Sequence, residues 1–558
     1  MLQKVRELSK SLAIYGLGDV AIQIVNFLLL KVYVQYLSPS DYGILGLLGA
    51  VEAAAKLFFR WGLDGSFMRF WYDCDDDEAR QRLASTLFFF LLGINGMLLL
   101  VSTGAAPFVS TRMLGAGGFT LALQLVLLNT FAIGFTFIPF HVLRMRQQSR
   151  DFSLLTFSRS LATLVLRIVL VVGAGFGIWG VVLADLFVTI GLIAVMVRWF
   201  APLIRPMFSR RVLRESLGFG LPRLPHAVAQ QVMAVGDKFI LKMFRPLSDV
   251  GVYSMGVSFG LTEKLFLGAF EYAWAPFYYA SSREPDGARL FGGITTYVFA
   301  VLALLTAGLS AVGGDLLAVI VGPDYRAAAD VVTWTAVGVL FQGVYQLTSI
   351  GLNIMKRTQY YPLSTISGAA LNVGLNFALI PRWGILGAAW ANAAAYAFQA
   401  AIAFRLSQRF YPVPYETGRL VRVASAAFVA CATARALPAP GPLAGVMLRG
   451  TTVVIVMSGL LAATGFFRPD EIRALAALRR KRGPPSAVPP PPETIELAGE
   501  IVAADLPDEE LGDPERRRGS CPDPTGEAEV GRASTREVAR TGNATAGGEA
   551  GATGGARR

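Results

Sequence analysis

The sequence predicts an all-α polytopic membrane protein with about 14 transmembrane helices. Three observations lead to this fold class. Of the 558 residues, 54% are hydrophobic and only 16% are charged, whereas soluble domains are about 25% charged. The mean hydropathy is +0.50. Apolar segments of about 20 residues, the length that a helix needs to cross a bilayer, recur along most of the chain.

The predicted membrane segments follow one another closely. They cover residues 11–34, 43–63, 83–103, 118–143, 153–173, 177–199, 216–242, 251–275, 291–311, 330–354, 362–380, 386–406, 419–437 and 443–466. The first apolar run is longer than a signal-peptide core and ends without a small-residue cleavage site, so we expect it to stay as a span. Residues 468–558, which contain "GPPSAVPPPPE", are poor in large apolar residues and are predicted to form a disordered cytoplasmic tail.

Basic residues are concentrated in every second connection between these segments. Arg144, Arg146 and Arg150 lie in one such connection, and Arg205 and Arg210 lie in another. Because cytoplasmic loops carry the excess of Lys and Arg, both termini are predicted to lie on the cytoplasmic side of the inner (cytoplasmic) membrane. The net charge of +12 is therefore interpreted as a topology signal, and no nucleic-acid partner is predicted.

Three short motifs occur twice, at matching places in two halves of the chain. They are "LSPSDYGILGL" (37–47) and "RPLSDVGVYSM" (245–255), "GIWGVVLAD" (177–185) and "GILGAAWAN" (384–392), and "RMRQQSR" (144–150) and "IMKRTQY" (354–360). Parallel repeats of this kind are found in transporters with a site between the halves. The sequence therefore predicts a six-helix lobe at 1–205, a second six-helix lobe at 206–410, two additional helices at 411–467 and the tail.

Ionisable residues inside the predicted segments are the main candidates for a functional site. Such a residue costs about 2.5 kcal/mol or more in a membrane span, so it usually faces protein or water and marks a pathway. The basic candidates for binding an anionic substrate group are Arg60, Arg159, Arg167, Arg223, Lys238 and Lys264. Arginine suits a phosphate because its planar guanidinium can donate two parallel hydrogen bonds. For Arg60 and Arg159, near the cytoplasmic face, snorkelling towards water is the alternative.

Two of these predictions depend on which carboxylates pair with the cations. Arg167 lies near the centre of its segment and is the strongest single candidate, but it could instead pair with a carboxylate such as Asp185. Lys56 is four residues from both Glu52 and Arg60. This spacing predicts an ion pair between Lys56 and Glu52, with one cation of the group left free.

The leading segment of each half carries one polar face. Tyr15, Asp19, Gln23 and Asn26 share a face of the first segment, and Arg223, His226, Gln230 and Asp237 share a face of the seventh. These faces favour a polar cavity between the halves, and hydrogen bonding between helices is the alternative. Pro222 and Pro225 are expected to distort the start of the seventh segment, which suits a gating helix.

Coupling to an ion gradient needs a group that exchanges a proton or binds a cation. Asp19, Asp237 and His226 are of the right type. Asn372 and Asn376 lie one turn apart in the eleventh segment and could add amide oxygens for Na⁺ near Asp237. The sequence shows no metal-binding spacing and no pairing of a nucleophile with a base, so no catalytic residue, metal or cofactor is predicted.

Several motifs carry a family likeness. "GLGDVAIQIVNFLLLKVYVQYLSPSDYGILGL", "LSDVGVYSMG", "WAPFYY" and "GILGAAWAN" resemble the polysaccharide-biosynthesis flippases of the multidrug/oligosaccharidyl-lipid/polysaccharide exporter superfamily, over about residues 5–466. The resemblance implies two six-helix lobes around a central cavity, alternating access, and export of a polyprenyl-diphosphate-linked sugar unit. In sodium-coupled members, an acid in the seventh helix and polar residues in the eleventh form the ion site. Asn376 departs from that pattern because it is not an acid.

The predicted function is translocation of a lipid-linked oligosaccharide for polysaccharide biosynthesis, and not an enzymatic reaction. The expected partners are this substrate, membrane lipid, H⁺ or Na⁺ as coupling ion, and a polysaccharide polymerase or export machinery. One alternative is a multidrug or cation antiporter of the same superfamily, whose cavity should be acidic and aromatic. Another is a membrane glycosyltransferase or polysaccharide polymerase. Such enzymes usually have a long outer loop with catalytic carboxylates, whereas the longest outer connection here, about 312–329, has only Asp315, Asp324 and Asp330 at its edge.

Overall fold

The computed structural model describes residues 30, 34–74, 76–114, 117–146, 148–282, 284–322 and 325–468. All regular secondary structure in these ranges is helical. The predicted all-α polytopic fold is thus confirmed. The tail, most of the first predicted segment and the coupling candidate Asp19 lie outside the described residues.

The first lobe contains helices α2 to α8. Their bounds are α2 (Pro39–Arg60), α3 (Leu63–Tyr72), α4 (Asp77–Leu114), α5 (Thr120–Gly134), α6 (Phe137–Met145), α7 (Ser149–Ile168) and α8 (Gly177–Phe200). Helix α2 begins where it does because Ser38 and Asp41 form a capping box: the Asp41 N–H donates to Ser38 Oγ at 3.2 Å, and the Ser38 N–H donates to Asp41 Oδ2 at 2.8 Å. It ends at Trp61 and Gly62, which both have positive φ.

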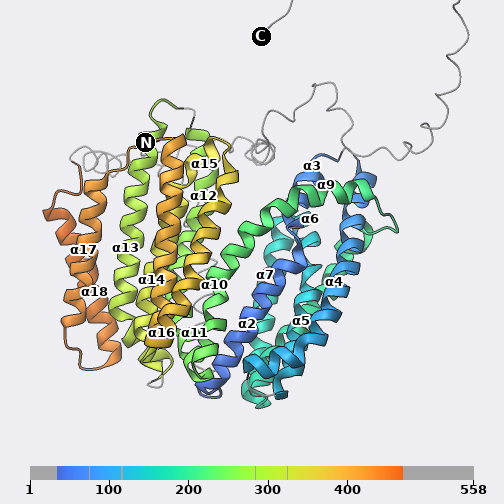
Figure 1. The fold of residues 1–558 in the computed structure, drawn as a ribbon, viewed down its shortest axis with the longest axis horizontal. Helices are drawn as coiled ribbons and strands as arrows, with labels where there is room; N and C mark the ends of the chain where they lie inside the picture. Colours follow the sequence, from blue (N-terminus) through green and yellow to red (C-terminus); the bar gives the residue numbers. More distant parts are fainter. Residues whose placement is uncertain are drawn as a thin grey trace, which may run out of the picture.

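Residues 206–410, the predicted second lobe, contain helices α9 to α16, and two further helices follow them. Their bounds are α9 (Arg210–Gly220), α10 (Leu224–Phe244), α11 (Leu247–Gly260), α12 (Lys264–Ser281), α13 (Gly287–Ile320), α14 (Ala328–Thr348), α15 (Ile350–Ile354), α16 (Tyr361–Phe410), α17 (Thr417–Ala436) and α18 (Pro442–Ala463). Figure 1 shows two groups of helices side by side: α9 lies with the first group, beside α3, and α17 and α18 lie at the outer edge of the other group.

Nine helical stretches of the described part are long and apolar enough to cross a membrane. The number of about 14 spans stays a prediction, because α10, α11, α12 and α17 fall outside this set. The predicted segments 362–380 and 386–406 both lie within α16, which is broken at Gly384 (φ +56°, ψ −129°). A Cβ at Gly387 would lie 2.5 Å from the carbonyl oxygen of Leu379, whereas residues eight apart in a straight helix are about 12 Å apart. The chain therefore turns back sharply at Gly384.

The same turn occurs at the repeated motif of the first lobe. Gly177 has φ +55°, close to the +56° of Gly384. A Cβ at Gly180 would lie 2.9 Å from the backbone of Leu170 in the preceding helical stretch. In the same way, a Cβ at Gly387 would lie against the helical stretch that precedes Gly384. "GIWG" and "GILG" therefore have the same local structure, because each needs one glycine for a positive φ and a second for close helix packing.

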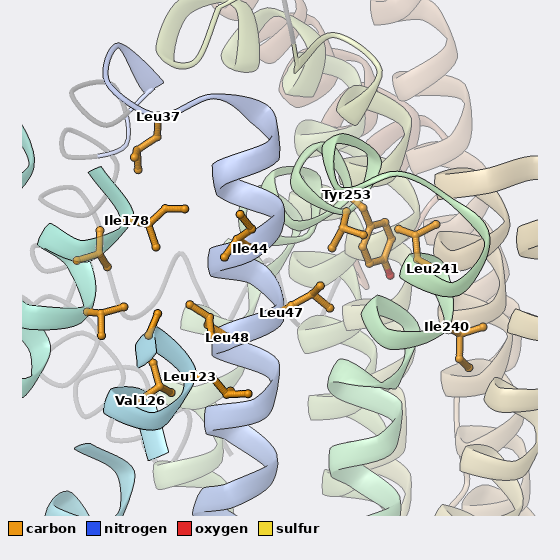
Figure 2. Packing of buried hydrophobic residues seen from close by; sticks show 14 of the residues in the cluster. Leu37, Ile44, Leu47, Leu48, Leu123, Val126, Ile178, Ile240, Leu241 and Tyr253 are labelled. Atoms are coloured by element: carbon orange, nitrogen blue, oxygen red, sulfur yellow. The ribbon is translucent and has the colours of Figure 1, made fainter. Parts of the chain in front are cut away.

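A buried apolar cluster surrounds α2 and extends into both lobes. Figure 2 shows Leu48 of α2 pointing towards Leu123 and Val126 of α5, and Leu47 pointing towards Tyr253 of α11. By contrast, large apolar side chains such as Phe428 and Ile455 are 76% and 70% exposed on α17 and α18. Exposed apolar side chains of this kind suit a surface in contact with lipid.

Candidate functional site

The two lobes touch where α2 and α11 begin, at the end of the molecule that we call the Pro39 end. Gly43 lies so close to Leu247 that a Cβ there would overlap its carbonyl oxygen, and Gly251 has the same relation to Pro39. A Cβ at Gly46 would lie 3.1 Å from the Cβ of Ser254. The two copies of the Ser-Asp-x-Gly motif thus pack directly against each other, and only small residues allow this approach.

The opposite end of the molecule, the Gly62 end, is built differently. Here α9 packs on α3 of the first lobe, and Ser66 Oγ donates to the carbonyl oxygen of Ser216 at 2.7 Å. A short 3₁₀ turn, Leu221–Arg223, separates α9 from α10, which packs on α16 and α2 of the molecule's centre. The distortion predicted at Pro222 and Pro225 is therefore present, and the seventh predicted segment reaches from one lobe to the other (Figure 1).

Two cavities lie along α2 inside the first lobe. The Arg167 cavity, about 400 Å³, is lined by residues that include Tyr42, Glu52, Asn129, Arg167 and Asp185. The Arg159 cavity, about 370 Å³ and nearer the Gly62 end, is lined by residues that include Lys56, Arg60, Phe137, Phe140, His141, Arg144, Phe152 and Arg159. The second cavity thus combines four Lys or Arg side chains with apolar aromatic walls, an arrangement suited to an anion.

Most of the predicted cations of the first lobe are paired. Arg167 donates from Nε and Nη2 to the two carboxylate oxygens of Asp185, at 2.9 and 2.7 Å, so the alternative considered for Arg167 is the arrangement present. Lys56 pairs with Glu52 at 2.6 Å, as predicted from their spacing.

The expectation that one cation of the Lys56 group stays free is wrong. Arg60 Nη1 lies 3.2 Å from the Asp64 carboxylate, which α3 presents one turn further along the chain. Arg159 is different: among the described residues, no carboxylate lies within 4.0 Å of its guanidinium. Arg159, and Arg144 in the same lining, are therefore the cations of this cavity without an ion-pair partner among the described residues.

The polar face of α10 makes hydrogen bonds to other helices of the second lobe. Asp237 is only 2% exposed and accepts hydrogen bonds from the Tyr253 hydroxyl, from the Lys238 backbone N–H at 2.8 Å and from Asn392 Nδ2 at 3.4 Å. His226 Nδ1 lies 3.1 Å from Thr365 Oγ1. Arg223 is exposed at the start of this face. For Asp237 and His226, the alternative of hydrogen bonding between helices is thus the observed one.

Asn372 and Asn376 bind each other and not Asp237. Asn376 Nδ2 donates to Asn372 Oδ1 at 3.0 Å, and both side chains are fully buried. No group of three His, Cys, Asp or Glu side chains in the described part could hold a metal ion. A Na⁺ site at Asp237 and the two asparagines stays a prediction.

Sequence reasoning missed Tyr253 and Asn392 as partners of Asp237. The internal repeat carried a signal for Asn392, because it occupies the position in "GILGAAWAN" that Asp185 occupies in "GIWGVVLAD". Each of these residues binds a charged side chain of its own lobe: Asp185 binds the half-buried Arg167, and Asn392 binds the buried Asp237. Nothing comparable points to Tyr253, since "SDYGILGL" has no hydroxyl at the matching place.

The two candidate lysines of the second lobe, Lys238 and Lys264, lie close to Asp237 without pairing with it. Lys238 contacts the Asp237 carboxylate through its backbone N–H, and no ion pair of its ammonium occurs among the described residues. Lys264 lines a small cavity of about 50 Å³ together with Asp237, Tyr253 and Asn392. The adjacent Glu263 is buried and accepts a hydrogen bond from Thr306 Oγ1 at 3.0 Å. The two lysines thus remain candidates for binding an anion.

Comparison with known proteins gives a family-model match over part of the chain. Residues 34–267 match the family model described as "Polysaccharide biosynthesis protein". The resemblance inferred from the sequence is confirmed. The match covers most of the first lobe and the start of the second. It includes both copies of the Ser-Asp-x-Gly motif. No curated protein matches the chain.

Solved structures with the same fold include a flippase and drug transporters. The lipid II flippase MurJ, in an inward closed conformation, superposes with a TM-score of 0.65 at 14% identity, over 81% of this chain and 99% of that one. A multidrug resistance MATE family transporter of the MOP superfamily matches in its inward-facing conformation with a TM-score of 0.56 at 15% identity, over 72% and 96% of the two chains. Its outward-facing conformation gives 0.53 at 14% identity, over 75% and 97%. These likenesses establish the fold.

Proposed function

We propose that this protein moves a polyprenyl-diphosphate-linked oligosaccharide across the cytoplasmic membrane for polysaccharide biosynthesis, by alternating access between its two lobes. The observation that carries the proposal is the Arg159 cavity, a basic and aromatic space of about 370 Å³ in a chain with a polysaccharide-biosynthesis match and a flippase-like fold. The positive-inside rule predicts both termini in the cytoplasm, and in the proposed orientation the Gly62 end and this cavity would therefore face the cytoplasm.

The diphosphate would bind first at the Arg159 cavity. Arg159 has no carboxylate within ion-pair distance among the described residues, and Arg144 lines the same space. Guanidinium groups in a site with aromatic walls bind phosphate strongly because little water competes for it. Arg167 is a weaker candidate than the sequence indicated, because a ligand would have to displace Asp185.

Release on the other side would require the lobes to separate at the Pro39 end. That end is closed by the packing of Gly43 against Leu247 and of Gly251 against Pro39. Helix α10 spans the two lobes, with Pro222 in the 3₁₀ turn before it and Pro225 in its first turn, so it is suited to transmit the movement. The polyprenyl chain can stay in lipid while the sugar passes between the lobes.

The coupling ion would act at Asp237. This carboxylate is buried at 2% exposure in the second lobe and lines a cavity large enough for a water molecule or a small cation. Binding H⁺ or Na⁺ would change its charge and therefore its hydrogen bonds to Tyr253 and Asn392, which lie on two other helices. A polymerase or other export machinery would act on the released product.

A multidrug or cation antiporter is the alternative that the MATE likenesses keep open. The charge of the first-lobe cavity does not favour it: Lys56 and Arg60 are paired with Glu52 and Asp64, and Arg144 and Arg159 add positive charge that would repel a cationic drug. Family and fold point to a transporter, which leaves a membrane glycosyltransferase or polymerase with no feature that favours it.

The deciding experiment is a flipping assay in proteoliposomes with a fluorescent polyprenyl-diphosphate-linked oligosaccharide. We expect the protein to move the substrate between leaflets, and protein-free vesicles not to do so. No movement of this substrate, together with export of an organic cation by the same vesicles, would overturn the proposal in favour of the antiporter.

A further inference from the structure

Two arginines from different lobes converge on one aromatic ring at the Gly62 end. The Arg69 guanidinium of α3 lies 5.0 Å from the centre of the Phe219 ring, and the Arg223 guanidinium lies 4.3 Å from the same centre. Arg223 reaches across the joint: a Cβ at Gly65, one helical turn before Arg69, would lie 3.3 Å from its Nη1. We call Arg69, Phe219 and Arg223 the arginine joint.

The backbone brings the two arginines together and holds them there. A Cβ at Gly62 would lie 2.6 Å from the carbonyl oxygen of Gly220, so the chains preceding α3 and α10 are in direct contact. The hydrogen bond from Ser66 to the Ser216 carbonyl fixes α9 on α3 one turn away. The convergence is thus a consequence of main-chain packing and not of two long side chains lying free on the surface.

The arginine joint lacks an anion. Among the described residues, neither Arg69 nor Arg223 has a carboxylate within 4.0 Å, and Nη1 of Arg69 is buried without a hydrogen-bond partner. Asp73, one turn beyond Arg69, attracts it electrostatically but forms no ion pair with it. Two positive charges beside one ring, with a buried N–H donor unused, are stabilised if the oxygens of one anion bridge them.

The position of the joint indicates which anion it is. Helix α2 runs 22 residues from the Pro39 end, about the thickness of the bilayer core, so α3 and α9 lie at headgroup depth. The exposed face of α9 carries further basic residues, Arg210, Arg211 and Arg214. Anionic headgroups of the cytoplasmic leaflet are attracted to such basic segments.

We propose that the arginine joint binds the phosphate group of a lipid in the cytoplasmic leaflet, bridging Arg69 of the first lobe and Arg223 of the second. The phosphate has two sources: the diphosphate of the transported lipid before it reaches the Arg159 cavity, or the phosphodiester of a bilayer lipid. The first source rests on the proposed function and the second does not. In both cases the bound anion ties α9 to α3 and holds this end of the molecule in the arrangement seen here.

The test measures lipid binding to the full chain in detergent by native mass spectrometry, without any transport. The probes are a polyprenyl diphosphate without sugar and phosphatidylglycerol, each compared with its phosphate-free counterpart, the polyprenol and diacylglycerol. The variants are Arg69→Gln/Arg223→Gln, the charge-preserving Arg69→Lys/Arg223→Lys, and Arg214→Gln as a matched control on the exposed face of α9.

We expect the double Gln variant to bind at least one phosphate probe roughly tenfold more weakly or worse, the double Lys variant to keep most of the affinity, and Arg214→Gln to match the wild type. Weakened binding of the polyprenyl diphosphate alone identifies the transported lipid, and weakened binding of phosphatidylglycerol alone identifies a bilayer lipid. Unchanged binding of both probes by the double Gln variant would overturn the proposal and leave a packing contact only. Because no flipping is measured, failure here does not depend on the proposed transport.

Discussion

At the scale of single residues, Arg159 has the clearest expected role. A charge-assisted hydrogen bond contributes about 1.5 to 3 kcal/mol. We therefore expect Arg159→Gln to raise the substrate concentration for half-maximal flipping by roughly tenfold or more, and Arg159→Lys to retain part of the affinity. Arg150→Gln is the matched control, since Arg150 is exposed in the first turn of the same helix. Equal effects of the Arg159 and Arg150 substitutions would exclude Arg159 as a ligand.

The Arg167–Asp185 pair can be tested by a double-mutant cycle. Arg167→Gln alone leaves the Asp185 carboxylate without its bidentate partner, and Asp185→Asn leaves the guanidinium without its own. We expect each single change to lower thermal stability and flipping, and the double change to recover much of both, because neither charge is then left unpaired. If the double variant is stable but still inactive, at least one of the two charged groups acts in transport beyond neutralising the other.

Asp237 and Lys238 are neighbours in sequence but should respond differently to neutralisation. The Asp237 carboxylate accepts three hydrogen bonds: one from a backbone N–H of its own helix and one from a side chain of each of two other helices. The Lys238 ammonium forms no ion pair with it. We expect Asp237→Asn to abolish the response of flipping to an imposed H⁺ or Na⁺ gradient, and Lys238→Gln to reduce flipping without abolishing that response. Mild effects of equal size would instead indicate that the two charges only neutralise each other.

At the scale of elements, the glycine turn inside α16 should be sensitive to a single methyl group. Gly384 has φ +56°, and a Cβ there would lie 3.3 Å from Arg245 Nε. Gly384→Ala should destabilise the protein by about 1 kcal/mol or more, because alanine is strained at positive φ. Gly374→Ala in the same helix has open space around it and should be neutral or stabilising. Thermal unfolding in detergent compares them; equal melting temperatures would contradict the turn.

Sequence patterns predicted the elements better than they predicted the charge pairs. The fold class follows from the length of apolar segments. The chain reversal at Gly384 lies between two predicted segments, 362–380 and 386–406, and in a repeated motif, although the glycine turn itself was not predicted. The partner of Arg167 could be named only as an alternative, since it comes from another helix. The pairing of Arg60 with Asp64 was missed although the two are four residues apart, because the predicted second segment ended at residue 63.

At the scale of the whole molecule, the internal repeat has a structural consequence that sequence comparison alone does not show. The two copies of the Ser-Asp-x-Gly motif do not lie in separate places: they pack against each other at the Pro39 end. Matching positions such as Gly43 and Gly251 therefore face each other across the boundary between the lobes. Alternating access requires this contact to open and close in every cycle, which small residues permit without large side-chain rearrangement.

A reversible crosslink across this contact tests alternating access most directly. A Cβ at Gly46 would lie 3.1 Å from the Ser254 Cβ, slightly less than the 3.5 to 4.5 Å or so of a disulfide, so a small shift allows the bond. The double variant Gly46→Cys/Ser254→Cys is made in a background with Cys74, Cys431 and Cys521 replaced by Ser, and each single cysteine variant is the control.

Flipping of the lipid-linked oligosaccharide is then measured in proteoliposomes before oxidation, after oxidation and after reduction. We expect the oxidised double variant to stop flipping, the reduced one to recover, and the single variants to be indifferent to the oxidant. Flipping by fully crosslinked protein at the rate of the reduced protein would show that substrate crosses without the lobes separating at the Pro39 end.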